Sequence, residues 1–283
     1  MYKYSFDDLN GKICVLTGGA GIIGASLVRG LASVGVKTAI VDLNEEAANN
    51  LAAEVEKEYG VTTIGVGASV LDKESLIVAK KVINDKLGKI DVLINGAGGN
   101  SPMATTKVEK MTPDSLSQLE NTFYGLNMEG FQKVYDLNFK GTLLPTMVFT
   151  TDMLEAGKGG VINISSMNAY KPLTKIPAYS AAKASINNFN EWLAVHLAKT
   201  GIRVNAVAPG FFLTNQNRFL LTDEKTGAPT ARGLKIVNST PMGKYGEPEH
   251  MNGAVLFLLS DISSFVTGIC IPVDGGYSAY GGV

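Results

Sequence analysis

The sequence predicts an α/β fold, with a doubly wound parallel sheet in three layers and a single domain over residues 1–283. Short apolar runs rich in β-branched residues alternate with longer helical patterns along most of the chain. This order is typical of parallel strands joined by crossover helices. The first strand runs into a glycine-rich turn, and a carboxylate follows the second strand. We find neither an internal repeat nor a linker, so we expect one domain with a lid after the sixth strand.

The composition agrees with one large globular domain. Of 283 residues, 45% are hydrophobic and 18% are charged, and the formal net charge is −1. Without a long basic or acidic block, there is no electrostatic reason to expect nucleic acid or an anionic membrane as a partner. The chain lacks a signal-peptide core, and no apolar run approaches the ~20 residues of a membrane span. We therefore expect a cytoplasmic protein, in which Cys14 and Cys270 are small core residues.

The first predicted strand, residues 12–16, leads through the glycine-rich turn 17–21 into a helix over 22–32. Backbone N–H groups at the start of such a helix favour a pyrophosphate, and glycine lets a cofactor approach the backbone closely. A plain tight turn is the alternative. The candidate cofactor-binding residues here are Gly18, Gly21, Ile22 and Ile23.

The second predicted strand, residues 37–41, is followed by Asp42, which lies 24 residues after Gly18. An acid at this place accepts hydrogen bonds from the ribose diol of an adenosine and repels a 2′-phosphate. Leu43 is a further candidate contact, and neither it nor Asn44 supplies a cation that would offset the repulsion. We therefore expect NAD rather than NADP. Capping of the next helix by Asp42 is the alternative.

The alternation continues with helix 45–59, strand 62–66, helix 73–87 and strand 91–94. Small residues then follow at 95–99 (NGAGG), where they suit a ligand that crosses the carboxyl edge of the sheet. The irregular residues 100–130 are expected to form a loop on the substrate side, with a short helix near 113–119. A helix over about 131–156 follows it.

A strand over 160–164 leads to Ser165 and Ser166, and an Ala-rich helix begins after Pro177. Tyr179 and Lys183 lie four residues apart, on one face of this helix. A cation beside a phenol favours the phenolate, so we expect Lys183 to lower the pKa of Tyr179 toward the range of a general acid and base. The Ser166 hydroxyl is placed to hold a carbonyl oxygen. Any helix can carry such a pair, so the pair alone does not establish a site.

The rest of the chain completes the sheet with strand 203–207, helix 248–259 and strand 269–273. A polar segment over about 214–241 is expected to form a lid that excludes water from the site. His196 and His250 have no evident partner for a site. With two scattered histidines and two scattered cysteines, we expect no metal centre.

Seven motifs occur in one order: TGGAGIIG, NGAG, Asn138, Ser166, YSAAK, PG with Thr214, and PVDGG. On these motifs, residues 7–283 resemble the short-chain dehydrogenase/reductase family. The resemblance implies a Rossmann-fold enzyme with a nicotinamide cofactor that assembles as a homotetramer or dimer. It implies that Tyr179 is the general acid/base, that Lys183 lowers its pKa and binds the nicotinamide ribose, and that Ser166, thirteen residues before Tyr179, orients the carbonyl.

The resemblance also assigns a role to Asn138, which would hold a water in the proton relay. The alternative is a core hydrogen bond to backbone. Two departures from the family pattern matter: Ile22 takes the place of a glycine in the turn, and Ser69-Val70 stands where the family has Asp-Val. We therefore expect a reshaped phosphate turn and an adenine held mostly by backbone. The other cofactor contacts that the resemblance implies are Val70, Asn95, Ala97, Gly98, Pro209 and Thr214, the last at the nicotinamide carboxamide.

The segments INGAGGN, ISSMNAYKPLTKIPAYSAAKA and APGFFLTNQNR resemble the branch of D-mannonate oxidoreductases, or fructuronate reductases. That likeness implies interconversion of D-fructuronate and D-mannonate with NAD(H). Lys175 and Arg218 are candidates to pair with the carboxylate of a sugar acid, and Asn100 and Asn168 to meet its hydroxyls. Ordinary exposed loop residues are the alternative. Polar loops argue against a steroid or fatty-acyl substrate.

Two rival functions remain. One is another polyol or keto-acid dehydrogenase, such as a gluconate 5-dehydrogenase type. The other is a non-catalytic NAD-binding scaffold that keeps the fold for binding alone. The presence of Asn138, Ser166, Tyr179 and Lys183 together argues against the scaffold.

Overall fold

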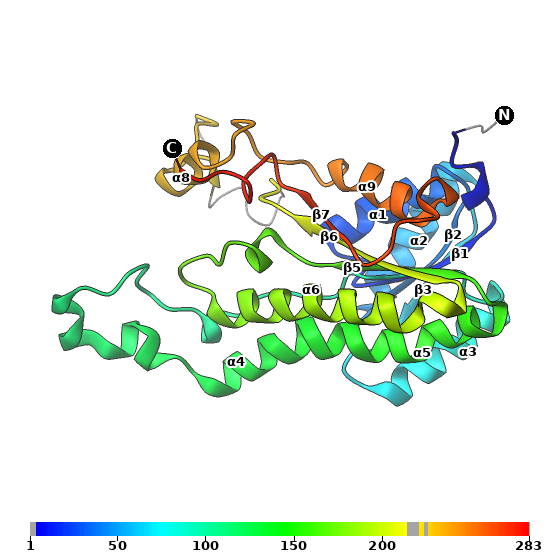
Figure 1. Cartoon of the computed structure of the whole chain (residues 1–283), viewed down its shortest axis with the longest axis horizontal. Coiled ribbons are helices and arrows are strands. Elements are labelled where there is room, and N and C mark those ends of the chain that lie inside the picture. Colours follow the sequence, from blue (N-terminus) through cyan, green and yellow to red (C-terminus); the bar gives the residue numbers. More distant parts are fainter. Residues whose placement is uncertain (1–3, 214–220, 224–225, 283) are drawn as a thin grey trace.

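The computed structural model describes residues 4–213, 221–223 and 226–282. Seven parallel strands form one sheet in the order β3-β2-β1-β4-β5-β6-β7, which Figure 1 shows between two layers of helices. The order reverses between β1 and β4, where the carboxyl ends of open α/β sheets bind ligands. The predicted fold class is therefore confirmed. The strands are β1 (Ile13–Thr17), β2 (Lys37–Asp42), β3 (Thr63–Gly67), β4 (Val92–Asn95), β5 (Gly159–Ile164), β6 (Ile202–Pro209) and β7 (Cys270–Val273).

Alternate residues of the central strands enter two separate cores. Leu16 and Ile94 belong to one apolar cluster, while Val15 and Leu93 belong to the other. Because both faces are covered, consecutive residues of these strands are apolar until each strand nears its carboxyl end, which is typical of a parallel sheet. Helices α1 (Ile22–Ala32), α2 (Glu45–Tyr59) and α9 (His250–Leu259) cover the first face, and α3 (Lys73–Lys86), α5 (Gly141–Ala156) and α6 (Pro177–Leu197) cover the second.

The helix expected over 131–156 is interrupted. It consists of α4 (Met128–Tyr135), a π-helical turn η5 (Asp136–Lys140) and α5. Pro145 lies inside α5, and it has no N–H to donate to Gly141, the first residue after the π-helical turn. Asn138, in this irregular turn, is fully buried.

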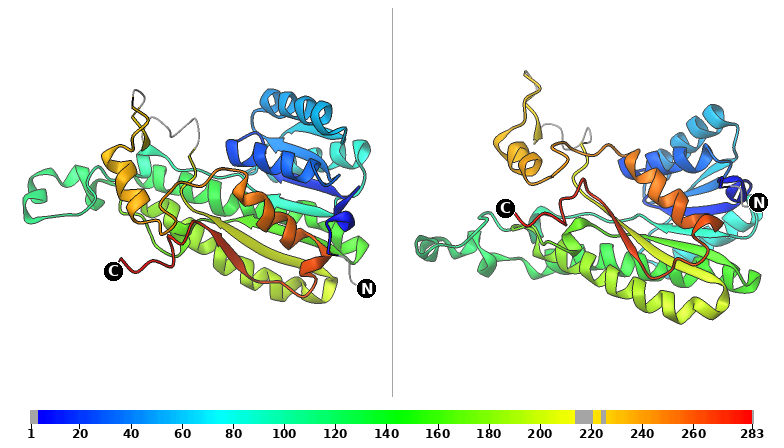
Figure 2. Two further views of the ribbon diagram at one scale, coloured as in Figure 1. Left: turned by 90° about the horizontal axis from the view of Figure 1, so that it is seen from above. Right: turned by 45° about the horizontal axis from the view of Figure 1, so that its top comes forward.

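Residues 100–127, hereafter the arm, project from the body of the molecule (Figures 1 and 2). Instead of the one short helix expected near 113–119, the arm contains three 3₁₀ helices, η2 (Pro102–Ala104), η3 (Pro113–Asn121) and η4 (Phe123–Gly125). Its base is tied to the loop before α6, because the N–H of Thr106 donates to the carbonyl of Lys175 at 3.0 Å.

The polar segment expected as a lid is described only in part. It contains α8 (Ala231–Asn238), while residues 214–220 and 224–225 lie outside the described part of the chain. Among the residues that the structure describes, none of the helices combines the length and apolar character needed to cross a bilayer. The remaining short helices are η1 (Asp7–Leu9), η6 (Met167–Ala169), η7 (Ala198–Thr200) and η8 (Asp261–Ser263).

Candidate active site

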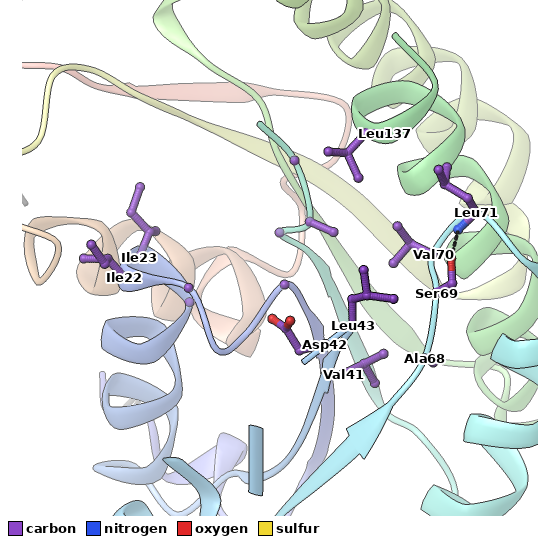
Figure 3. Close-up of a pocket in the computed structure, with 16 residues that line it drawn as sticks. Ile22, Ile23, Val41, Asp42, Leu43, Ala68, Ser69, Val70, Leu71 and Leu137 are labelled. Atoms are coloured by element: carbon purple, nitrogen blue, oxygen red, sulfur yellow. Dashed lines mark hydrogen bonds between the residues drawn. The ribbon is translucent and has the colours of Figure 1, made fainter. Parts of the chain in front are cut away.

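A cavity of about 500 Å³ lies at the carboxyl edge of the sheet, where β1, β2, β3 and β4 end (Figure 3). Seven of the predicted cofactor residues line it on the side of α1 and β2–β3, and two more lie after β4. The lining residues that the sequence analysis named are Gly18, Gly21, Ile22, Ile23, Asp42, Leu43, Val70, Ala97 and Gly98. We call this space the cofactor cavity.

Glycine is required in the turn after β1 by close packing. Gly18 has a φ of +66°, and a Cβ at this position would lie 2.7 Å from the Cα of Ala97. A Cβ on Gly24 would lie 2.6 Å from the carbonyl oxygen of Gly18. Gly21 is the N-cap of α1 in extended conformation, so the free N–H groups of the first helical turn follow it directly. The turn thus has the close backbone approach and helix start that suit a pyrophosphate.

Asp42 is held at the cavity by two backbone N–H groups. Its carboxylate accepts from Ala20 at 3.2 Å and from Asn44 at 3.0 Å, and Figure 3 shows it beside Val41 and Leu43. The alternative in which Asp42 caps α2 is wrong, because Asn44 is the N-cap and accepts from the N–H of Ala47 at 3.0 Å. Asp42 therefore retains acceptor capacity toward a ligand.

The cofactor cavity also has lining residues that the sequence analysis did not single out as cofactor contacts. They are Gly24, Val41, Ala68, Ser69, Leu71, Gly96 and Leu137. Ser69 shapes this wall, since its hydroxyl accepts from the N–H of Leu71 at 3.3 Å (Figure 3). A signal was available for Ala68 and Ser69, because they directly follow β3, whose carboxyl end shares the sheet edge with β1 and β2. Leu137 enters from the π-helical turn, which no sequence pattern indicated.

Two further predicted cofactor residues do not line the cofactor cavity, and a third is outside the described residues. The Asn95 side chain is buried between the sheet and α5, where it donates to Thr146 and Asn163, both at 2.9 Å, and it does not line the cofactor cavity. Pro209 is buried at the end of β6, also outside the cavity lining. Thr214 lies outside the described residues.

The four predicted catalytic residues come together beside Gly98. Lys183 donates from Nζ to the carbonyl of Ile164 at 2.7 Å, and Nζ lies 5.6 Å from the centroid of the Tyr179 ring. A Cβ on Gly98 would lie 2.6 Å from Asn138 Oδ1 and 3.3 Å from Lys183 Nζ. Ser166, just after β5, interacts with the Tyr179 phenol, and its hydroxyl also accepts from the N–H of Asn168 at 3.2 Å.

Burial changes both titrating groups of this cluster. It raises the pKa of the Tyr179 phenol, and the hydrogen bond with Ser166 offsets this rise only in part. Burial also lowers the pKa of Lys183 to about 8. The expectation that Lys183 brings the pKa of Tyr179 below its ordinary value is therefore wrong for the chain as it stands. The ammonium is directed to Ile164, and desolvation of the phenol has the larger effect.

The side-chain amide of Asn138 fixes the backbone segment that follows β4. Its Nδ2 donates to the carbonyls of Gly99 at 2.7 Å and Val134 at 2.8 Å, and its Oδ1 accepts from the N–H of Gly99 at 3.2 Å. The core hydrogen bonds weighed as the alternative are therefore present. They hold the segment 98–99 against the π-helical turn, next to Lys183.

The predicted substrate residues are dispersed. Asn100 is exposed and donates to the hydroxyl of Thr105 at 3.1 Å. Asn168 is 4% exposed, and its Oδ1 has no hydrogen-bond partner among the described residues. Lys175 is half-buried and lines a second cavity of about 540 Å³, which we call the outer cavity. Arg218 lies outside the described residues.

The outer cavity begins beside the first turn of α6, which carries Tyr179 as its third residue. It lies between the loop 172–176 and helix α8. Glu109 of the arm, Phe211 after β6 and Tyr277 after β7 complete its lining. Among the described residues, no group of three or more His, Cys, Asp or Glu side chains has the arrangement of a metal centre.

Comparison of the chain with known proteins identifies its family. A family model described as Enoyl-(Acyl carrier protein) reductase, a short-chain dehydrogenase/reductase model, matches residues 18–278. A relative from Bacillus subtilis described as "Uncharacterized oxidoreductase UxuB" is 47% identical over 278 residues, which are 98% of each chain.

Two solved structures are similar over their whole length. One, a proposed D-mannonate oxidoreductase from Haemophilus influenzae with bound NAD, has a TM-score of 0.92 and 47% identity, covering 98% of this chain and 99% of that one. The other, a gluconate 5-dehydrogenase from Burkholderia cenocepacia in complex with NADP and tartrate, has a TM-score of 0.81 and 28% identity, covering 98% and 100%.

Proposed function

This chain belongs to the short-chain dehydrogenase/reductase family and is an oxidoreductase, and we propose that it interconverts D-fructuronate and D-mannonate with NAD(H). The observation that carries the proposal is the cluster of Ser166, Tyr179 and Lys183 beside Gly98, at the edge of the cofactor cavity. The similar structure with bound NAD and a proposed D-mannonate activity supports both the cofactor and the substrate.

The chain's own residues fit a dinucleotide with a free 2′-hydroxyl. Gly18 and Gly21 line the cavity, and Gly21 as the N-cap presents the free N–H groups of the first turn of α1 to phosphate groups. Asp42 would accept hydrogen bonds from the ribose diol, and the described lining of the cofactor cavity contains no cation that would bind a 2′-phosphate. NAD is therefore the cofactor that these residues favour, as predicted, and it supplies a carbon that gives or takes the hydride.

The catalytic roles follow from the positions of the four residues. We assign Tyr179 to give a proton to the substrate oxygen during reduction and to remove it during oxidation. Ser166, which is hydrogen-bonded to the phenol, would hold the same oxygen at Tyr179. Lys183, when protonated, would stabilise the phenolate that forms as the proton leaves. Asn138 would keep the segment 98–99 in place. We also assign it to hold a water molecule of the proton relay.

A polar substrate agrees with the surroundings of the catalytic cluster. Asn168 follows Ser166 by two residues and has an unpartnered, buried Oδ1 among the described residues. Lys175, four residues before Tyr179, supplies a cation to the outer cavity. Hydroxyl groups and a carboxylate of a sugar acid satisfy such groups, whereas a long apolar chain leaves them desolvated and unpaired. We keep Asn100 and Arg218 as further proposed substrate contacts.

A related activity is the second candidate. The similar structure of a gluconate 5-dehydrogenase favours another oxidation of a sugar acid on the same catalytic cluster. A non-catalytic scaffold is disfavoured, because such a protein has no need for the buried Lys183, whose burial has an energetic cost.

Turnover of matched ketoses tests the proposal. We expect the purified protein to oxidise NADH with D-fructuronate, and to prefer NADH over NADPH, while D-tagaturonate and 5-keto-D-gluconate react at most slowly. Turnover of 5-keto-D-gluconate instead would move the function to the second candidate. No turnover of any of these ketoses, with NADH binding intact, would rule out the proposed substrate class.

The remaining parts of the proposal concern the molecule as a whole. We propose that residues 1–283 form one domain, because the described elements from β1 to β7 share one sheet. We propose a homotetramer, supported by the exposed apolar side chains Met147, Leu154, Trp192 and Val195 on α5 and α6. We place the protein in the cytoplasm, which agrees with two unpaired cysteines.

A further inference from the structure

The outer cavity has an unusual balance of charge. Its lining includes Lys175 from the loop before α6, Arg232 and Lys235 from α8, and one acid, Glu109, from the arm. Three cations and one carboxylate leave an excess of positive charge in a molecule whose formal net charge is −1. Such a local excess of cations at the mouth of a cavity attracts a small anion.

The cations are not equivalent. Lys235 lies 3.3 Å from the carboxylate of Glu109, so its charge is already paired. Arg232, one helical turn earlier on α8, has no ion pair within the described ranges, and the same holds for the side chain of Lys175. The guanidinium of Arg232 presents two parallel N–H donors that match a carboxylate.

Apolar groups form the rest of the outer cavity. Phe211 and Tyr277 meet edge to face, with ring centroids 5.3 Å apart. Ile176, the residue before α6, lies on the wall near Tyr179. A wall of this kind accepts the C–H face of a short carbon chain while polar groups hold its end. The cavity therefore suits an amphipathic anion of sugar size.

We propose that Arg232, assisted by Lys175, binds the carboxylate of the substrate in the outer cavity and thereby selects sugar acids over uncharged ketoses. The inference rests on the proposed function, to which it adds the specificity-determining group. The substrate would extend from the Ser166–Tyr179 pair along the loop 172–176 to α8. Glu109 limits the positive charge of the site by pairing with Lys235.

The kinetic test uses two substrates that differ only in the charged end. D-Fructuronate and D-fructose share the ketone and hydroxyl arrangement, but D-fructose has a hydroxymethyl group in place of the carboxylate. For Arg232→Gln, we expect the KM for D-fructuronate to rise about tenfold to hundredfold, the loss expected for a charged hydrogen bond. We expect kcat to stay within about twofold, because Arg232 does not touch the reacting carbon. The kcat/KM for D-fructose should not change.

Three further variants sharpen the test. Arg232→Lys keeps the charge without the two-pronged donors, so its KM should lie between those of wild type and Arg232→Gln. Glu109→Gln frees Lys235 and should lower the KM for D-fructuronate severalfold, the opposite direction. Lys57→Gln removes an exposed cation of α2, far along the chain from the cavity, and should leave both substrates unaffected.

The outcomes separate the inference from the proposed function. An unchanged KM in Arg232→Gln, or an equal rise for D-fructose, would overturn the inference while D-fructuronate turnover keeps the function. If the wild-type enzyme turns over no sugar acid, the proposed function is refuted. Calorimetric measurement of ligand affinity then still tests the outer cavity. In the presence of NADH, D-mannonate cannot react, so its affinity is compared with that of D-mannitol. Preference for D-mannonate that Arg232→Gln removes supports the inference, and equal affinities refute it.

Discussion

At the scale of single residues, the catalytic cluster depends on a balance between burial and charge. Burial raises the pKa of Tyr179 and lowers the pKa of Lys183 to about 8. Both shifts favour the neutral forms, as expected where charge is removed from water. Lys183 nevertheless remains mostly protonated at pH 7, because that pH is below its pKa. The phenol is thus a proton donor in its resting state, and it needs the neighbouring ammonium when it gives up the proton.

This balance predicts opposite pH dependence for the two reaction directions. Oxidation requires a deprotonated Tyr179, so its kcat should rise with pH across the range below the raised pKa. Reduction requires the protonated phenol and should not rise over the same range. Initial rates with D-mannonate and with D-fructuronate between pH 6 and 9 measure both.

Tyr179→Phe should lower kcat by a factor of about 10² to 10⁴ in both directions.

Binding of NADH serves as the control for that variant, because the phenyl ring keeps the packing of Tyr179 while only the hydroxyl is lost. A Tyr179→Phe enzyme with wild-type rates, or an oxidation rate that falls from pH 6 to 8, would contradict the assigned role.

At the scale of elements, a buried carboxylate joins three of them. Asp152 of α5 has a fully buried side chain that pairs with Lys80 of α3 at 2.7 Å. It also accepts from the N–H of Ile90, just before β4, at 3.1 Å. Burial by itself raises the pKa of Asp152, but the hydrogen bonds from Lys80 and Ile90 and the charge of Lys80 together lower it below the ordinary value. Asp152 therefore fixes β4, and with it the glycine-rich segment after β4, against the helical layer.

We predict that Asp152→Asn lowers the free energy of unfolding by about 3 kcal/mol at pH 7, because it leaves Lys80 next to a neutral partner in a buried place. Since the pKa of Asp152 is lower in the folded state, its stabilising contribution is present above the unfolded value and is lost as pH falls through the folded value. Urea unfolding of both proteins at pH 7 and at about pH 2, well below the ordinary carboxyl pKa of 3.8, measures this, and the difference between them should shrink at the lower pH. Glu155→Gln, which removes an exposed partner of Lys89, is the matched control. Equal loss in both variants would refute the special role of Asp152.

At the scale of the whole molecule, one group of exposed apolar side chains lies on α5 and α6, where Met147, Leu154, Trp192 and Val195 face solvent. Val195 is 81% exposed and Trp192 is 58% exposed, and Trp192 stacks on His196 with ring centroids 4.7 Å apart. Apolar groups gathered in this way commonly mark a contact between proteins. They support the proposed self-association, with these two helices as the contact surface.

We therefore predict that Val195→Glu weakens the assembly, because burying a charge in an apolar contact is costly. Light scattering during size-exclusion chromatography should show a smaller mass than for wild type at the same concentration. Val78→Glu, at an exposed position of α3, is the control and should leave the mass unchanged. A monomeric wild-type protein, or a Val195→Glu variant with the wild-type mass, would contradict the proposed interface.

The local sequence pattern was sufficient to predict much of the fold and part of the candidate site. The alternation of apolar runs and helical segments predicted the parallel sheet, and the residues that follow β1 and β2 predicted one side of the cofactor cavity. Such features are local, because a strand end, a turn and a helix start are determined by neighbouring residues. The roles of Asn138, Ser166, Tyr179 and Lys183 came from a resemblance to a family, and the structure brings these four residues together.

Only the tertiary structure decided the properties that depend on distant contacts. It turned the Asn95 side chain toward Thr146 of α5 and Asn163 of β5, and it made the π-helical turn that buries Asn138. It raised the pKa of Tyr179, where the spacing of Tyr179 and Lys183 had predicted a decrease, because desolvation depends on all surrounding elements. It also brought Arg232 and Lys175, 57 residues apart, to one cavity. Burial and proximity arise from packing of the entire chain, so no local pattern contains them.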